Sequence, residues 1–370
     1  MRRAGRLARI VLAGLLGLSL TGCWDQAPIE NRAVVVAIAV DPGRRGNERW
    51  TFLFPNVSAT ASSLSSTSPS ENFYAVAVDA PSLAAAFTAV QQRLARDVYP
   101  GQLQVVLWSD RLPTRAVASV VAAVAQNGIM PSAAWVLATV GQASRILTEP
   151  SPQSVVPSYY LAKFFGCRSC QPFDLGEESW DWWDRHLTPG IAPIAPVAQA
   201  AGQTVTINRL AVYPPDGPPA VMPPLATEGY GYLSGRVNKA TLSWRWRGQW
   251  LTLADIRDTP RIRVHLERGA VVVQETVNAT GILAAVSQRQ PMEAAERAAA
   301  RLAAAAILDR CRAAVRFANR THTDPFGYAR LAAWTDNRAA AGMTPTTLDR
   351  LPIRADLTVH VTVRGAGEFR

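Results

Sequence analysis

The chain has 370 residues, of which 48% are hydrophobic, and its 38 Lys and Arg against 28 Asp and Glu give a formal net charge of +10. This length and apolar content predict two or three globular domains with an ample core. Lys163 and Lys239 are the only lysines, and the arginines are spread along the chain instead of clustered. The sequence therefore offers no basic stripe for nucleic acid, and no nucleic-acid partner is expected.

Residues 1–23 have the pattern of a bacterial lipoprotein signal. Four arginines come first, and residues 10–20 then form an apolar run that is shorter than the roughly 17–25 residues of a membrane span. Leu20-Thr21-Gly22-Cys23 follows, with small residues directly before the cysteine. We expect residues 1–22 to be removed as a signal peptide and Cys23 to carry a diacylglyceryl group as a membrane anchor. Two acyl chains, such as palmitate, hold a protein stably at about 0.8 kcal/mol per buried methylene. Without the four arginines of the signal, the mature chain keeps a formal charge of +6.

Residues 23–200 are expected to form an N-terminal domain. Residues 33–40 are a continuous apolar run rich in β-branched residues, which is typical of a buried strand. A strand at 103–108, a helix at 114–126 and a strand at 134–140 follow one another with short turns. This order indicates a βαβ unit and therefore a mixed sheet covered by helices.

Two stretches of this domain lack a clear pattern. Residues 58–70 are rich in Ser and Thr and are expected to form a surface loop or insertion. Residues 148–200 are rich in proline and aromatic residues and are expected to be irregular. The first domain boundary is therefore placed near residue 200.

The second half of the chain has a different pattern. Short strand candidates between Pro and Gly turns predict a small middle β domain at residues 201–255. Residues 256–370 are expected to form a C-terminal domain in which an antiparallel sheet packs on one long helix, residues 292–319. The apolar stripe expected to face the sheet consists of Ala304, Leu308, Cys311 and Val315, and its partners on the final strand are Leu357, Val359 and Val361. The chain is therefore assigned to the α+β class, with three domains.

The cysteines of the mature chain besides Cys23 have different surroundings. Cys311 lies on the apolar stripe of the long helix and is expected to be a buried, inert thiol. Cys167 and Cys170 form a lone C-x-x-C motif, whereas a structural zinc needs four ligands and only His186 lies near in sequence. Because an exported protein can form disulfides, a local disulfide and two free thiols both stay open.

The segment Trp180-Asp181-Trp182-Trp183-Asp184 combines bulky aromatic residues with carboxylates. Core packing is the favoured interpretation, because indole side chains bury a large area wherever they lie. A protein interface built on Trp180, Trp182 and Trp183 is the second interpretation, since Trp is enriched among interface hot spots. A shelf for a sugar or another flat ligand is the third.

No arrangement of residues typical of catalysis is present in the sequence. It contains no G-x-S-x-G elbow, no H-E-x-x-H helix and no P-loop, and Gly229, Gly231 and Gly235 have the wrong spacing for a dinucleotide fingerprint. The four histidines are widely separated. We therefore expect no enzyme activity and assign no catalytic residue, cofactor or metal site.

The mature N-terminus resembles the start of the spore germination lipoproteins of the Ger(x)C family. The likeness begins at Cys23-Trp24-Asp25 and continues through the apolar run at residues 33–41. Further matching segments are residues 96–99, 136–143, 210–213 and 324–327, the long helix and the final strand. The chain departs from the family at Gln26, Ala27 and Pro28, where a basic pair and Glu are frequent. The C-x-x-C and Trp-rich segments are not part of the family pattern.

The resemblance implies a non-enzymatic C subunit of a nutrient germinant receptor, lipid-anchored on the outer face of the inner spore membrane. Its implied partners are the polytopic A subunit and the transporter-like B subunit of the receptor, with which it would signal the arrival of a nutrient. The family fold that it implies has three α+β domains, the middle one small. The alternative is a solute-binding lipoprotein of a transporter, and a lipid-anchored envelope enzyme comes third.

Overall fold

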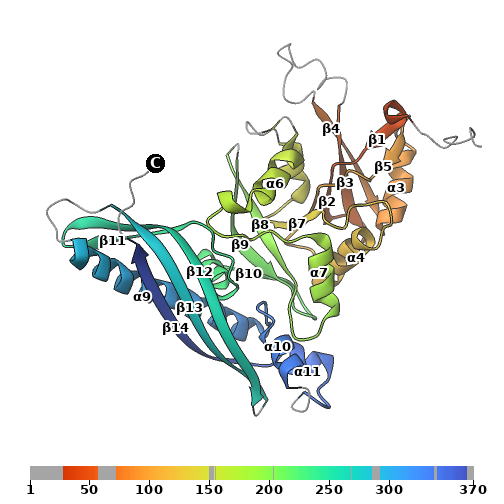
Figure 1. Ribbon diagram of the computed structural model, residues 1–370. Coiled ribbons are helices and arrows are strands. Elements are labelled where there is room, and N and C mark those ends of the chain that lie inside the picture. Colours follow the sequence, from red (N-terminus) through yellow and green to blue (C-terminus); the bar gives the residue numbers. More distant parts are fainter. Residues whose placement is uncertain are drawn as a thin grey trace, which may run out of the picture.

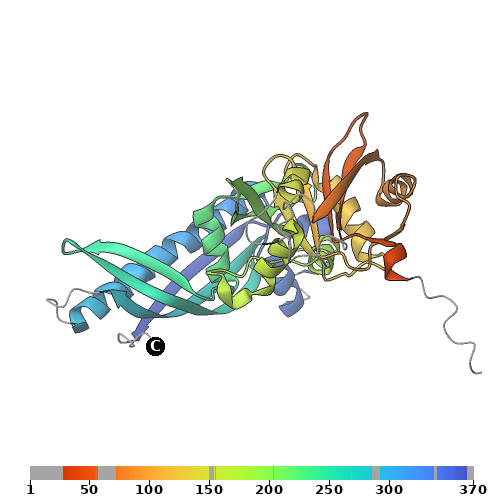
Figure 2. The ribbon, with the colours of Figure 1, turned by 90° about the horizontal axis from the view of Figure 1, so that it is seen from above.

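Two halves, each built on one main β-sheet, form an elongated molecule (Figure 1; Figure 2). This computed structural model describes residues 28–56, 72–149, 154, 156–202, 204–267, 269–285, 292–336 and 340–364. Cys23, the signal peptide before it and the Ser/Thr-rich residues 58–70 lie outside the described residues. We call residues 28–222 the N-terminal half and residues 224–364 the C-terminal half. Within the described ranges, no helix is both long enough and apolar enough to cross a membrane.

The N-terminal half is organised around an eight-stranded mixed sheet of order β10-β9-β8-β7-β6-β2-β3-β4. Its strands are β2 (Ala37–Pro42), β3 (Glu48–Pro55), β4 (Phe73–Ala80), β6 (Val105–Ser109), β7 (Trp135–Thr139), β8 (Ile194–Ala201), β9 (Thr204–Val212) and β10 (Ala220–Met222). The central strands β2, β6, β7 and β8 are parallel, and the outer strands are added antiparallel at both edges. A separate parallel pair, β1 (Arg32–Val34) and β5 (Asp97–Tyr99), lies beside the short helix η1 (Ile29–Asn31).

Helices cover both faces of this sheet, which explains why its central strands are apolar throughout. Ile38 and Val40 pack on the side of α3, α4 and α7, whereas Ala37 and Ala39 pack on the side of α5 and α6, because successive strand side chains point to opposite faces. These helices are α3 (Leu83–Gln91), α4 (Thr114–Ala125), α5 (Ala143–Thr148), α6 (Pro157–Gly166) and α7 (Ser179–Leu187). The predicted buried strand and the βαβ unit β6-α4-β7 are both confirmed.

The expectation that residues 148–200 are irregular is wrong. This region contains α6, the 3-10 turn η3 (Arg168–Cys170), α7 and β8. Pro157 does not interrupt α6, because it occupies the first turn of the helix, where the missing N–H is not needed. The aromatic residues that suggested irregularity include Phe165 and Trp182, both buried against the sheet.

The C-terminal half is a four-stranded sheet of order β11-β12-β13-β14 with a long helix across one face (Figure 1). Its elements are α8 (Pro224–Leu233), β11 (Ala240–Trp246), β12 (Gln249–Glu267), β13 (Ala270–Ala285), α9 (Met292–Thr321), α10 (Tyr328–Thr335), α11 (Pro345–Asp349) and β14 (Ile353–Arg364). The first three strands are antiparallel, as expected, but β14 is parallel to β13. The reason is that α9 returns the chain across the sheet, as in a βαβ unit. The α+β fold with a large mixed sheet, a C-terminal sheet and one long helix is confirmed.

Residues 201–255 contribute strands to both sheets, which differs from the small middle β domain that was expected. β9 and β10 complete one edge of the eight-stranded sheet, and β11 forms the edge of the four-stranded sheet. Short strands satisfy their backbone hydrogen-bonding groups by pairing with an existing edge, so two larger sheets form here in place of a third small one.

The buried stripe of α9 agrees with the expected one in its second half only. Cys311 and Val315 are buried as expected, whereas Ala303 and Ile307 are buried in place of Ala304 and Leu308, which are partly exposed. Cys311 is a free thiol, and burial raises its pKa, which keeps it protonated and unreactive.

Helix α8 lies close against α9, and a glycine permits this approach. A Cβ added at Gly229 would lie 2.0 Å from the carbonyl oxygen of Arg310 in α9. Gly229 therefore serves helix packing, in agreement with the wrong spacing of these glycines for a nucleotide-binding loop.

Candidate functional site at the junction of the two halves

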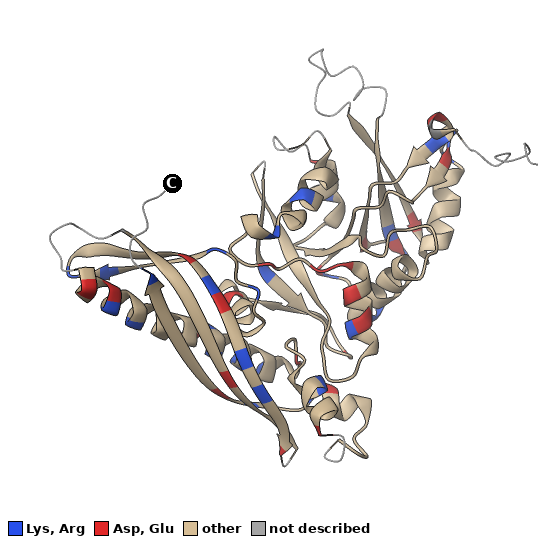
Figure 3. Ribbon diagram, viewed as in Figure 1, with Lys and Arg blue, Asp and Glu red and all other residues tan. Residues whose placement is uncertain are grey.

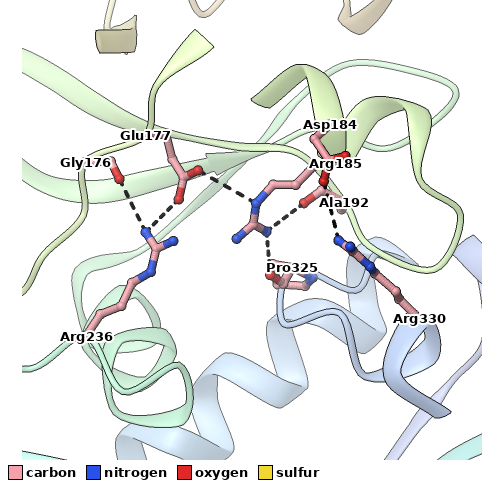
Figure 4. A network of polar contacts seen from close by, with 8 residues as sticks. All are labelled: Gly176, Glu177, Asp184, Arg185, Ala192, Arg236, Pro325 and Arg330. Atoms are coloured by element: carbon pink, nitrogen blue, oxygen red, sulfur yellow. Dashed lines mark hydrogen bonds and ion pairs between the residues drawn. The ribbon is translucent and has the colours of Figure 1, made fainter. Parts of the chain in front are cut away.

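A buried carboxylate, Glu177, connects the two halves (Figure 4). Its side chain is 1% exposed, and its Oε1 accepts a hydrogen bond at 2.6 Å from Nη1 of Arg236, which lies after α8 in the C-terminal half. Its Oε2 lies 3.7 Å from Nε of Arg185 in α7. One carboxylate thus balances two guanidinium groups that are both largely shielded from water. Such a group is costly to bury unless it is paired.

The turn at residues 324–327 continues the network from the side of the C-terminal half. Arg185 donates to the carbonyl oxygen of Pro325 at 3.1 Å, and the N–H of Ala192 donates to the carbonyl oxygen of Asp324 at 2.7 Å. Next to it, Arg330 of α10 pairs with Asp184 of α7 at 3.6 Å (Figure 4). This turn is one of the segments that resemble the Ger(x)C family, and in the structure it joins the two halves.

The side chain of Asp324 holds this turn in shape. It is 2% exposed, and its carboxylate accepts hydrogen bonds from the N–H groups of Phe326, Gly327 and Ala329 at 2.7 to 3.0 Å. Burial raises the pKa of Asp324 to about 6, although these backbone donors favour the charged form. Gly327 has φ +77°, which glycine adopts without strain, and it precedes the first turn of α10.

The three tryptophans of the Trp-rich segment have three different surroundings on α7. Trp182 is fully buried, with ring centroids 6.2 Å from Trp108 and 5.4 Å from Tyr213 in edge-on geometry. Trp108 also donates from Nε1 to the hydroxyl of Tyr213 at 2.6 Å. Trp183 is partly buried, whereas Trp180 is 49% exposed and donates to Glu178. The segment thus anchors α7 on the sheet, and only Trp180 offers a large exposed indole for a partner.

Cys167 and Cys170 are joined by a disulfide, with Cα atoms 5.3 Å apart. The disulfide loop is held by the C-terminal half, because Asn238 donates from Nδ2 to the carbonyl oxygen of Arg168 at 2.7 Å. The backbone N–H of Asn238 also donates to Pro172 at 2.9 Å. Of the two states that the sequence left open, the structure has the disulfide, and it restrains a second strip of the junction.

Two hollows lie along the junction. A pocket of about 180 Å³ is lined by His186, Tyr213 and Asp349, among others, and burial lowers the pKa of His186. A larger cleft of about 350 Å³ lies beside the disulfide loop. Its walls are mostly apolar, and its polar lining includes the ion pair Glu228–Arg310 and the side chain of Lys239.

A further group of buried acids lies inside the C-terminal half, away from the junction network. Glu275 on β13 is 2% exposed, and its Oε2 accepts a hydrogen bond from the Tyr328 hydroxyl at 2.6 Å. Burial raises the pKa of Glu275 to about 7 and that of Asp258 on β12 to about 7. Among the described residues, no group of three or more His, Cys, Asp or Glu is placed to hold a metal ion.

The sequence pointed to the tryptophans and the cysteines but missed Glu177, Arg185 and Arg236. Glu177 and Arg236 are 59 residues apart, and single charged residues at such a distance give no local pattern. The buried position of Glu177 follows from its backbone, whose carbonyl oxygen accepts from the N–H of Val136 in β7 at 2.9 Å. Cys23, the expected lipidation site, lies outside the described residues.

Comparison with known proteins gives two findings. Residues 25–200 match the family model described as the spore germination protein N-terminal domain. The crystal structure of the GerBC protein is similar to this structure with a TM-score of 0.52 and 11% sequence identity, over 88% of this chain and 96% of that one. Among curated proteins, none matches the chain significantly.

Residues 25–200 therefore carry the N-terminal domain of a spore germination protein. The fold shared with GerBC covers both halves of the chain. Together these findings support the resemblance to the Ger(x)C family that the sequence indicated.

Proposed function

We propose that this chain is the lipid-anchored C subunit of a nutrient germinant receptor and that it acts by assembly, without turnover of its own. The observation that carries the proposal is the germination-protein domain at residues 25–200 directly after the lipoprotein motif ending at Cys23. Its partners would be the A and B membrane subunits of the receptor, on the outer face of the inner spore membrane.

The junction supports a role in which the whole body acts as one unit. Glu177, Arg185 and Arg236 couple the halves through buried charges, and the disulfide loop restrains them at a second place. A contact made by one half would therefore be transmitted to the other as a rigid displacement. We expect this rigidity to carry the subunit's part of the germination signal.

Anchoring at Cys23 would also strengthen weak contacts. The short stretch between Cys23 and η1 spans at most about 20–25 Å even when fully extended, so the η1 end of the molecule would stay near the bilayer. Confinement to one surface raises the effective concentration of membrane partners, and modest interfaces then suffice for a complex.

The test combines genetics with isolation of the complex. A strain that lacks the gene is expected to lose its response to one set of nutrients and to keep the others, and the tagged protein should co-purify with both membrane subunits from spore membranes. Cys23→Ala should abolish lipid labelling and reduce membrane association. Normal germination with every nutrient tested, or isolation without either subunit, would contradict the proposal.

The second candidate is a solute-binding lipoprotein of a transporter, and the cleft of about 350 Å³ beside Lys239 is the observation that favours it. Apolar walls with a few charged groups are usual for small-molecule sites. Calorimetry separates the candidates: the lipid-free mature chain, residues 24–370, should bind free nutrients little or not at all if it is a receptor subunit. Tight stoichiometric binding that Lys239→Ala abolishes would favour the solute-binding function.

A further inference from the structure

The hairpin that joins β11 to β12 has an unusual composition at its tip. Residues 244–250 read Trp-Arg-Trp-Arg-Gly-Gln-Trp, so aromatic and basic residues make up nearly all of it. The tip lies at one end of the long axis of the molecule, and η1 lies at the other end (Figure 2). Figure 3 marks basic residues at this end of the four-stranded sheet, next to a mixed group of charges on the start of α9.

The turn itself is tight and carries an arginine where a smaller residue is usual. Trp246 pairs with Gln249, which leaves Arg247 and Gly248 as the two turn residues, with φ of +49° and +79°. Two positive φ values define the type I′ turn, whose first position is normally Asn, Asp or Gly. A long cationic side chain is thus held at the outermost point of the hairpin despite an unfavourable backbone conformation.

Cationic and aromatic side chains lie on both faces of the hairpin next to the turn. Arg245 lies opposite Trp250 on the neighbouring strand, with its guanidinium carbon 4.5 Å from the ring centroid of Trp250. The indole of Trp250 is 56% exposed. On the other side of the hairpin, Arg247 lies 4.8 Å from the ring of Trp246, which packs partly on the start of α9. The tip therefore presents the exposed indole of Trp250 with Arg245 over it on one face, and Arg247 on the other face.

We propose that this hairpin tip is a second membrane-contact site, which binds the headgroup region of anionic phospholipids. Indole rings with one polar edge favour the membrane interface, and guanidinium groups bind phosphate oxygens in a forked geometry.

This inference goes beyond the proposed function and depends on it only for the location of the protein at a membrane. With Cys23 holding the η1 end and the hairpin holding the opposite end, the long axis would lie along the membrane surface. The orientation of the body toward its membrane partners would then be fixed, which a single point of attachment does not achieve.

The test uses the lipid-free chain, residues 24–370, so that the anchor and the receptor subunits have no influence on the result. Sedimentation with vesicles of phosphatidylglycerol and phosphatidylcholine should show binding that weakens with salt, and vesicles of phosphatidylcholine alone should bind little. The double variant Arg245→Glu, Arg247→Glu should weaken binding by at least about tenfold, because each basic residue near an anionic surface contributes measurably. Trp250→Ala should weaken it as well and remove a blue shift of tryptophan fluorescence.

Matched controls separate the tip from a general effect of charge or exposed indoles. Trp334→Ala removes an indole that is 67% exposed on α10, and Arg115→Glu reverses an exposed charge on α4; both should bind vesicles like the wild type. Circular dichroism melting of each variant checks that it is folded. The proposal is overturned if the wild-type chain does not bind anionic vesicles or if the tip variants bind as well as the controls.

A protein contact at the tip is the competing explanation. It is supported if the Trp250→Ala variant no longer co-purifies with the membrane subunits while the wild-type lipid-free chain does not bind vesicles. That result also overturns the lipid proposal. Vesicle binding through the tip by a chain that fails to assemble with the subunits would instead contradict the proposed function alone.

Discussion

The buried acid Glu275 makes the stability of the C-terminal half depend on pH in an unusual direction. The side chain is 2% exposed, its Oε2 accepts the hydrogen bond from Tyr328, and its Oε1 has no hydrogen-bond partner among the described residues. Burial raises its pKa to about 7, and the negative charge of Asp258 adds to this effect. We therefore expect Glu275 to be protonated in the folded protein under mildly acidic conditions.

The size of the effect follows from the difference between the folded and the unfolded pKa. A rise from 4.5 to about 7 corresponds to about 3 kcal/mol, at about 1.4 kcal/mol per pKa unit. The folded state binds a proton that the unfolded state releases, so the contribution of Glu275 to stability is complete below about pH 4.5. It is lost progressively up to about pH 7 and is constant above that pH.

Replacement of Glu275 by Gln tests this directly, because the amide oxygen can still accept from Tyr328 but cannot ionise. Urea unfolding of residues 24–370 between pH 4.5 and 8 should show a smaller decline of the unfolding free energy with pH in the variant. At pH 8 the variant should be more stable by up to about 3 kcal/mol. The control Glu293→Gln, at the exposed start of α9, should leave the decline unchanged.

Two results would refute this reasoning. One is a pH dependence in Glu275→Gln that equals that of the wild type, which would mean that Glu275 is not protonated in the folded state at neutral pH. The other is a variant that is less stable at pH 8, which would mean that the carboxylate is charged and favourably paired there.

Two further predictions concern packing and the junction, and urea unfolding at pH 7 checks both. Gly229→Ala should lower the free energy of unfolding by about 1–3 kcal/mol, because the new Cβ would lie 2.0 Å from the Arg310 carbonyl oxygen. Gly166→Ala is the control, since an added Cβ there meets nothing within 4 Å. Equal losses of stability in the two variants would contradict the argument. Glu177→Gln should cost about 3 kcal/mol, because Arg185 and Arg236 lose their shared counter-charge. Unchanged stability there, or an equal loss in Glu178→Gln, would show that the pairing is unimportant.

The sequence determined by itself the features that depend on short-range patterns. The expected signal peptide, residues 1–22, is a linear pattern, and the prediction that Cys23 is lipidated needs no tertiary information. The run at residues 33–40 was recognisable as buried because both faces of a covered parallel strand must be apolar. The start of α3 also depends on a local signal, because the hydroxyl of Ser82 caps the helix by accepting from the N–H of Ala85 at 3.3 Å.

Only the tertiary structure decided which members of these patterns meet. Trp180 and Trp182 are equivalent as sequence, yet one is 49% exposed and the other fully buried, because the orientation of α7 on the sheet is set by distant contacts. The same holds for α9, where packing against the sheet buries Ile307 and leaves Leu308 partly exposed. The junction could not be predicted from the sequence for the same reason. Glu177 and Arg236 meet because the backbone of Glu177 is hydrogen-bonded to Val136 in β7, while the backbone of Arg236 is hydrogen-bonded to both Gly231 and Asp174. Local patterns follow from the periodicity of one element, whereas long-range pairs follow from how elements pack, which no short window of residues encodes.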